Sequence, residues 1–170
     1  MLQIYCGNGK GKTTAAAGLA VRAKGAGLPV AVFQFLKNGT SSEISGLQKL
    51  EIRTECCAEC SRFTFLMDDD EKAAVTGHHN AMLLEIKRFA SENEAPVIIM
   101  DEFLDAYNKE MLDRRLAEEI IKELSVSSEI VLTGRNPSEI FCSMADYISE
   151  ISEVKHPYHK GITARKGIEY

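Results

Sequence analysis

The residues best suited to chemistry lie near the start of the chain, where glycines alternate with lysine and threonine between residues 7 and 14. Glycines let the backbone wrap around phosphate groups with its N–H groups pointing inward. A helix that follows at once adds partial positive charge, while Lys12 supplies a full charge and the Thr13 hydroxyl can bind Mg²⁺. The run predicts a Walker A loop that binds the phosphates of ATP, formed by Gly7, Asn8, Gly9, Lys10, Gly11, Lys12, Thr13 and Thr14.

This loop departs from the strict Walker A pattern at one position. The strict pattern requires a glycine five positions before Gly11, and this chain has Cys6 there. Gly7 and Gly9 precede Gly11 instead, so we expect a variant phosphate geometry.

A second motif follows the apolar run at residues 97–100, which ends in Asp101 and Glu102. An apolar strand that ends in acidic residues is the Walker B form. Ligands of parallel sheets bind beyond the C-terminal ends of the strands, so these carboxylates are expected beside the phosphate loop. There one of them can hold the Mg²⁺ ion.

A third candidate is Arg135, which follows the apolar run at residues 131–133. If that run is a strand of the same sheet, Arg135 lies at the same rim as the phosphate loop and can stabilise charge on the nucleotide. A surface arginine after a turn is the alternative, and its position alone does not decide between the two.

These motifs must be positioned by strands and helices that alternate along the chain. Short apolar or β-prone runs predict strands at residues 2–6, 29–36, 51–54, 96–100, 129–133 and 147–154. Longer amphipathic or alanine-rich patterns predict helices at residues 13–24, 43–50, 68–93 and 113–124. A further helix is expected to start at Asn136 as N-cap, with Pro137 in the first helical position and Glu139 three residues after the cap.

The alternation predicts an α/β fold, a P-loop NTPase-like three-layer sandwich with a mostly parallel central sheet. We expect one domain over residues 1–170. The formal net charge of -5 argues against nucleic acid as a partner. No apolar run approaches the about 20 residues that span a bilayer, and no signal-peptide pattern is present, so we expect a cytoplasmic protein that binds no membrane.

Five cysteines are present, and Cys57 and Cys60 have the spacing of metal ligands. No second pair of this kind exists in the sequence, although His78 and His79 could complete a site. We expect ordinary reduced thiols, including Cys56, with a metal or redox role as the alternative.

The chain as a whole resembles the ATP:corrinoid adenosyltransferases of the CobA/CobO/BtuR type. The tail is the most specific part of the resemblance, since other phosphate-loop families do not carry it. The matching segments are residues 7–16, 34–37, 101–102, 106–108, 133–135, 154–158 and 161–170.

The resemblance implies transfer of the 5′-deoxyadenosyl group of ATP to the Co(I) centre of a corrinoid, with release of intact triphosphate. Cobalt is then the nucleophile, so no catalytic side chain is required, and Lys12 and Arg135 act as charge stabilisers. Mg²⁺ would bind at Thr13, Asp101 and Glu102, with Glu102 the better candidate for direct ligation. The resemblance also implies a homodimer and a flavoprotein reductant.

The resemblance further places Phe63 and Phe65 against the corrin, where an apolar face favours the electron-rich cobalt. The alternative interpretation is that Phe63 and Phe65 are strand residues packed in the core. The residues by themselves leave two other functions possible. One is a kinase or ATPase that transfers the γ-phosphoryl group, and the other is a nucleotide-dependent binding module or corrinoid carrier without turnover.

Overall fold

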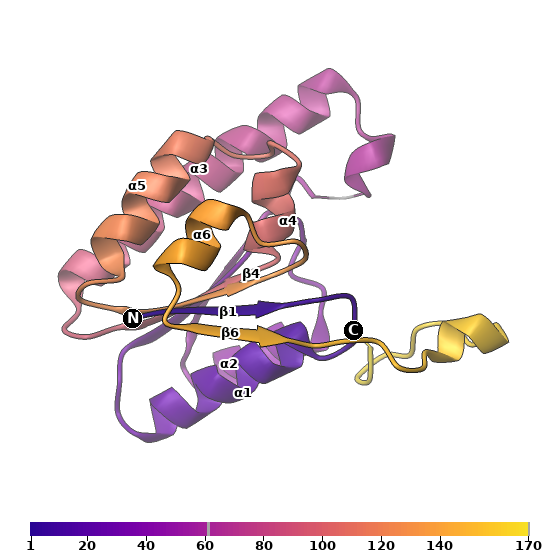
Figure 1. Cartoon of the computed structure of the whole chain (residues 1–170), viewed down its shortest axis with the longest axis horizontal. Coiled ribbons are helices and arrows are strands. Elements are labelled where there is room, and N and C mark those ends of the chain that lie inside the picture. Colours follow the sequence, from indigo (N-terminus) through magenta and orange to yellow (C-terminus); the bar gives the residue numbers. More distant parts are fainter. Residues whose placement is uncertain (61, 170) are drawn as a thin grey trace.

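A parallel β-sheet forms the centre of the structure, a computed structural model that describes residues 1–60 and 62–169 (Figure 1). The sheet has six strands in the order β3-β2-β4-β5-β1-β6, and all its neighbouring pairs are parallel. The strands are β1 (Leu2–Cys6), β2 (Val30–Gln34), β3 (Arg53–Cys56), β4 (Val97–Asp101), β5 (Glu129–Thr133) and β6 (Tyr147–Glu150). The predicted α/β class is confirmed, and the sheet is parallel throughout.

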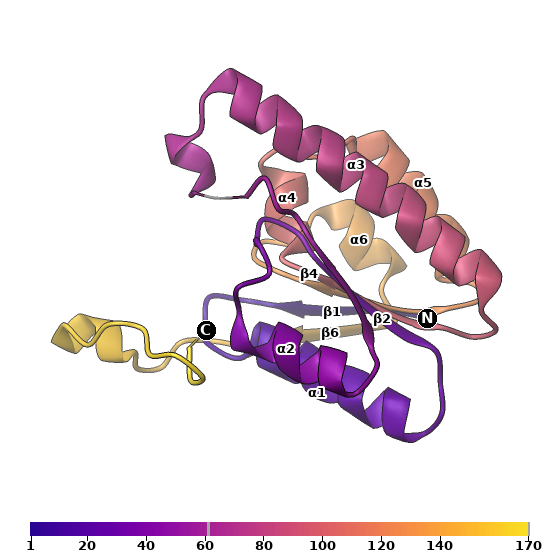
Figure 2. The same cartoon turned by 180° about the vertical axis from the view of Figure 1, so that it is seen from behind.

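Helices cover both faces of this sheet, which makes three layers (Figures 1 and 2). One face carries α1 (Lys12–Gly25) and α2 (Ser42–Lys49). The other carries α3 (Asp69–Glu92), α4 (Phe103–Asn108), α5 (Arg114–Leu124) and α6 (Glu139–Met144). Two 3₁₀ turns, η1 (Thr64–Leu66) and η2 (Pro157–Lys160), lie outside these layers.

Strand β4 illustrates why the predicted strands are continuous apolar runs. Successive side chains of a strand point to opposite faces. Ile98 and Met100 therefore belong to the core under α3, while Val97 and Ile99 belong to the core under α1. Because both faces are covered, residues 97–100 of the strand are all apolar.

Some element ends differ from the sequence-based expectation. Helix α3 begins as predicted from its acidic start, with a capping box between Asp68 and Glu71. The predicted start of α6 at Asn136 is wrong, because Ser138 is the N-cap. Asn136 has a φ of 47°, in the left-handed region that asparagine tolerates in turns, so residues 136–137 form a turn before the helix.

Two strands and one helix also depart from their expected ranges. The strand expected at 51–54 lies at Arg53–Cys56, and the one expected at 147–154 ends at Glu150. Helix α4 was not predicted, because six residues are too few to carry a helical period. Across residues 1–60 and 62–169, no helix has the length and apolar character needed to cross a membrane.

The turn after β5 depends on Gly134. Its φ is 143°, and a Cβ there would lie 2.7 Å from both the Asp105 carboxylate and the Leu104 Cβ. We expect Gly134→Ala to lower the free energy of unfolding by about 1–3 kcal/mol. Gly18→Ala in α1 is the matched control, since a Cβ there meets nothing within 4 Å, and we expect it to stabilise by about 0.5–1 kcal/mol. Urea denaturation measures both, and equal midpoints would contradict the strain assigned to Gly134.

Candidate functional site

The phosphate loop joins β1 to α1 and packs against the segment that follows β6. The Gly9 N–H donates to the Ile151 carbonyl oxygen at 2.7 Å. A Cβ at Gly7 or Gly9 would collide with that same oxygen, and Gly7 has a φ of 107°. The variant glycine pattern therefore has a steric cause, because the loop needs glycine where the chain after β6 passes closest.

Lys12 starts helix α1 and folds back over the loop. Its Nζ donates to the Gly9 carbonyl oxygen at 3.0 Å. Gly11, the N-cap residue, has no side chain with which to cap the helix. The Lys12 ammonium thus lies at the loop that leads into the N-terminus of α1, an arrangement that suits a polyphosphate.

Asp101 at the end of β4 is the centre of a buried polar network. One carboxylate oxygen accepts hydrogen bonds from the hydroxyls of Thr13 at 2.9 Å and Thr133 at 2.7 Å. The other accepts from the Lys37 ammonium at 2.7 Å and the Gln34 amide at 3.2 Å. The predicted neighbourhood of Asp101 and the phosphate loop is present, and four donors fix the carboxylate.

Glu102 has a different environment from Asp101. It is in the left-handed conformation, with a φ of 57°, and its carboxylate lies 3.8 Å from the Lys37 ammonium. Burial raises the pKa of Glu102, and the charge of Lys37 offsets this only in part. Burial alone would lower the pKa of Lys37, but the charge and hydrogen bond of Asp101 outweigh burial and raise it. Lys37 is therefore a cation held among acidic groups.

The sequence motifs do not predict a role for Lys37, Gln34 or Thr133. Gln34 and Thr133 are both fully buried; Gln34 ends the otherwise apolar β2, and Thr133 follows the apolar residues 130–132 of β5. A polar residue at the C-terminal end of a buried strand was the available signal. Lys37 carried no such signal, because only the fold brings its loop next to β4.

A cavity of about 550 Å³ opens beside this network. That volume is within the range of small-molecule sites, which is roughly 300–1,000 Å³. The cavity is lined by the phosphate loop, Lys37, the start of α2 and the C-terminal tail at residues 167–169. The tail is otherwise largely exposed and extends from the body of the protein (Figure 1), so these residues are brought back to the loop from the far end of the sequence.

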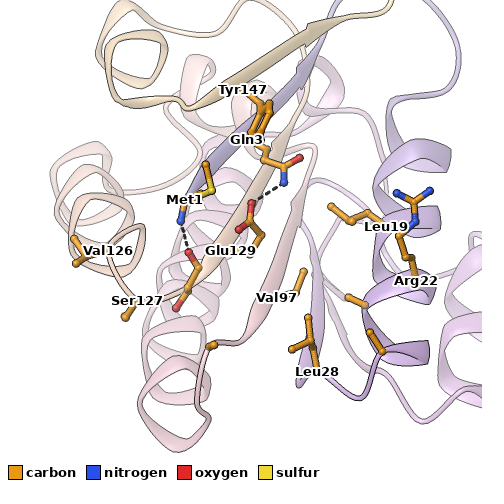
Figure 3. A pocket seen from close by; sticks show the side chains of 14 residues that line it. Met1, Gln3, Leu19, Arg22, Leu28, Val97, Val126, Ser127, Glu129 and Tyr147 are labelled. Carbon is orange, nitrogen blue, oxygen red and sulfur yellow. Dashed lines mark hydrogen bonds between the residues drawn. The ribbon is translucent and has the colours of Figure 1, made fainter.

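A larger hollow of about 680 Å³ lies at the opposite end of the sheet (Figure 3). Leu19, Leu28 and Val97 line it, and Gln3 bonds Glu129 at 2.6 Å on its wall. Because it lies at the N-terminal ends of the strands, away from the phosphate loop, we do not assign the nucleotide to it.

Arg135 follows β5 with its backbone fixed and its side chain exposed. Its N–H donates to the Asp105 carboxylate at 2.9 Å, and its carbonyl oxygen accepts from the Asn108 amide at 3.0 Å. The structure places Arg135 at the rim where β1, β4 and β5 end. It does not bring the guanidinium into the Asp101 network.

Phe63 and Phe65 flank the start of η1 and are exposed by 72% and 79%. Their rings stack at 5.5 Å with 12° between the planes. The alternative that they pack in the core as strand residues is therefore wrong. In Figure 1, η1 lies on the side toward which the strand arrows point, as does the tail.

The parallel sheet, the loop between β1 and α1 and the acidic end of β4 define a P-loop nucleotide-binding fold. Among solved structures, ATPases 2 and 3 of EssC from Geobacillus thermodenitrificans share this fold with a TM-score of 0.52. Sequence identity is 14%, and the match covers 98% of this chain and 34% of that one. At this identity, the likeness concerns the fold alone.

Sequence comparison identifies the family. The family described as ATP:corrinoid adenosyltransferase BtuR/CobO/CobP matches residues 1–170. The corrinoid adenosyltransferase of Escherichia coli is 30% identical over 169 residues, covering 98% of this chain and 84% of the relative. CobA of Salmonella typhimurium is 32% identical over 174 residues with the same coverages, and the Pseudomonas aeruginosa corrinoid adenosyltransferase is 30% identical over 177 residues, covering 100% and 83%. This chain belongs to the ATP:corrinoid adenosyltransferase family, which confirms the enzyme class that its loop and tail predicted.

Proposed function

We propose that this chain transfers the 5′-deoxyadenosyl group of ATP to the Co(I) centre of a reduced corrinoid and releases intact triphosphate. One observation carries the proposal beyond family membership. The C-terminal tail, which is the most specific part of the family resemblance, lies beside the phosphate loop. Gly167 and Glu169 of this tail line one cavity with Thr13 and Lys37. A general nucleotide site would need the loop but not this tail.

The chain's contribution to the reaction is position and charge. Cobalt of the substrate is the nucleophile that attacks C5′ of ATP, and the bond to the triphosphate breaks. The loop N–H groups and Lys12 hold the triphosphate, where negative charge increases as it leaves. Fixing C5′ in line with cobalt removes much of the entropic cost of their encounter. Arg135 stands at the same rim and is proposed to contact the nucleotide.

The donor set beside the loop suits Mg²⁺, since the Thr13 hydroxyl and two carboxylates are hard oxygen ligands. Asp101 already accepts hydrogen bonds from four donors. Glu102 has only the more distant Lys37 ammonium near its oxygens. We therefore assign direct ligation to Glu102, and positioning of Thr13 and Lys37 to Asp101. When bound, the ion neutralises charge on the triphosphate.

Glu102→Gln tests this assignment. We expect the apparent affinity for Mg²⁺ to fall about 10–100-fold, because a charged ligand oxygen is lost, with little change in the unfolding midpoint. Glu119→Gln on the exposed side of α5 is the control. Titration of MgCl₂ at saturating ATP measures both. An unchanged Mg²⁺ dependence in Glu102→Gln would remove this residue from the metal site.

Other features of the proposal come from the family resemblance. Phe63 and Phe65 contact the corrin, a use that their exposure supports. The active form is a homodimer, a flavoprotein supplies the electrons, and the reaction takes place in the cytoplasm.

The nucleotide-derived product tests the reaction type. Purified protein is incubated anaerobically with MgATP and a chemically reduced corrinoid, and the phosphates are separated by ion-exchange chromatography. Triphosphate is expected in equal amount to the ATP consumed. ADP with free phosphate would indicate phosphoryl transfer or hydrolysis and contradict the proposal.

A further inference from the structure

Two buried cysteines lie immediately after β3, on a turn that aims both toward α3. The Cys57 N–H donates to the Lys37 carbonyl oxygen at 3.0 Å, and the Cys60 N–H donates to the Cys57 carbonyl oxygen at 3.1 Å. Cys57 is 0% exposed and Cys60 is 6% exposed. His79 of α3 is fully buried beside them.

The ligand atoms of these residues converge on one point. The two sulfur atoms and a ring nitrogen of His79 lie within 4.8 Å of one another, with 3.9 Å between the Cys60 sulfur and His79 Nε2. Glu59 lies beside this group, since its Oε2 is 3.7 Å from the Cys57 sulfur, although its oxygen converges with Cys57 and His78 and not with Cys60 and His79. A tetrahedral ion with metal–sulfur bonds of about 2.3 Å and metal–nitrogen bonds of about 2.0 Å needs ligand atoms roughly 3.5–3.8 Å apart. Both measured separations are close to that requirement.

The hydrogen bonds of His79 hold the tautomer that a metal ion requires. His79 Nδ1 donates to the Met111 carbonyl oxygen at 2.7 Å, so Nε2 carries the lone pair, and Nε2 lies 3.9 Å from the Cys60 sulfur. Metal-binding histidines are commonly fixed in this way. The Nε2 lone pair accepts a hydrogen bond from the Leu36 N–H at 3.2 Å. An ion bound at Nε2 would replace this hydrogen bond.

His78 supports Glu59, the candidate for the fourth ligand position of the ion. His78 Nδ1 lies 2.6 Å from Glu59 Oε2, and Cys57, Glu59 and His78 form a second group of convergent ligand atoms. The hydrogen bond from His78 fixes the orientation of the Glu59 carboxylate, as residues that bond to metal ligands do in known metal sites.

We propose that Cys57, Cys60 and His79 bind a thiophilic divalent cation of the Zn²⁺ class, and that the neighbouring Glu59 carboxylate turns toward the ion to complete a tetrahedral site. Two thiolates and an imidazole favour such an ion over Mg²⁺ or Ca²⁺. Each cysteine thiol releases its proton when the ion binds. This site is separate from the Thr13, Asp101 and Glu102 oxygens, and it reverses the expectation of ordinary reduced thiols at Cys57 and Cys60.

The proposed ion would reinforce a junction of three parts of the chain that is already held by hydrogen bonds and by the His78–Glu59 ion pair. They are the segment after β3, helix α3 and the loop that carries Lys37. The same segment leads to η1, so the ion would anchor the base of the exposed Phe63 and Phe65 pair. The role is structural, and the proposal does not depend on which reaction the enzyme catalyses.

Anaerobic titration with Co²⁺ tests the site in the full-length protein, after chelation and under a thiol-free reductant. We expect binding of one Co²⁺ per chain with thiolate-to-cobalt charge-transfer absorption and the intense visible bands of tetrahedral cobalt. Zn²⁺ should displace the Co²⁺ and raise the unfolding midpoint. Cys57→Ser and Cys60→Ser should lose the charge-transfer bands, whereas the controls Cys56→Ser and Cys142→Ser should keep them.

Glu59→Gln keeps the test decisive if the serine variants fail to fold, since the Glu59 side chain is 42% exposed. This variant should stay folded and bind Co²⁺ about 10-fold or more weakly. The proposal is overturned if reduced wild-type protein gives no tetrahedral Co²⁺ spectrum, or if folded Cys57→Ser protein gives the same spectrum as wild type. It is also overturned if Cys57 and Cys60 form a disulfide in protein purified anaerobically and Zn²⁺ does not bind after its reduction.

Discussion

Replacing Lys12 with alanine will lower kcat/KM for ATP by about 10²–10³-fold, the usual effect of removing one preorganised charge-stabilising donor. Lys12 Nζ lies over the phosphate loop and bonds the Gly9 carbonyl oxygen. A triphosphate bound in the loop would replace the Gly9 carbonyl oxygen as the partner of this ammonium. Steady-state rates of corrinoid adenosylation at varied ATP give the effect.

Lys49→Ala is the control for this experiment, because Lys49 is an exposed lysine at the end of α2. It should retain wild-type kcat/KM. If Lys12→Ala were as active as Lys49→Ala, the loop would not be the triphosphate site. A loss confined to KM would instead mean that Lys12 binds ATP without favouring departure of the triphosphate.

Replacing Phe65 with alanine will slow the reaction that starts from Co(II) corrinoid and spare the reaction that starts from chemically prepared Co(I). The ring is exposed in the free protein and stacked on Phe63, so a bound corrin can cover it. We expect the Co(II) reaction to slow roughly 30-fold, which corresponds to about 2 kcal/mol in the barrier to reduction. An apolar face at cobalt withholds a donor ligand, and its removal makes reduction harder.

Both assays must be run on the same preparations for this prediction to be tested. Leu84→Ala is the control, because Leu84 is an exposed apolar residue of α3 at 56% exposure outside the aromatic pair. It should behave as wild type from either oxidation state. Equal losses for Phe65→Ala in the Co(I) and Co(II) assays would contradict a role at the cobalt face.

The parts of the site that sequence predicts are those encoded by local pattern. A phosphate loop has glycines and a lysine within eight residues, and the acidic end of β4 follows an apolar run, so each can be read without the fold. The parallel sheet then brings Asp101 to within 2.9 Å of the Thr13 hydroxyl. The sequence predicts this meeting because the C-terminal ends of parallel strands share one edge.

Contacts between distant segments have no such local pattern. Lys37 reaches Asp101 from a loop 64 residues earlier, and Gly167 returns to the loop from the other end of the chain. His79 faces Cys60 only because α3 crosses the end of β2. Sequence spacing drew attention to Cys57 and Cys60, but burial and the His79 tautomer depend on packing and were not predictable.

Adenosyl transfer is tested most directly by following cob(I)alamin absorbance anaerobically after addition of wild-type protein and MgATP. We expect loss of the Co(I) spectrum only when ATP is present, and formation of a light-sensitive product whose cobalt–carbon bond carries the adenosyl group of labelled ATP. A Co(I) spectrum that persists with active, ATP-bound protein, or a product without the adenosyl label, would contradict adenosyl transfer.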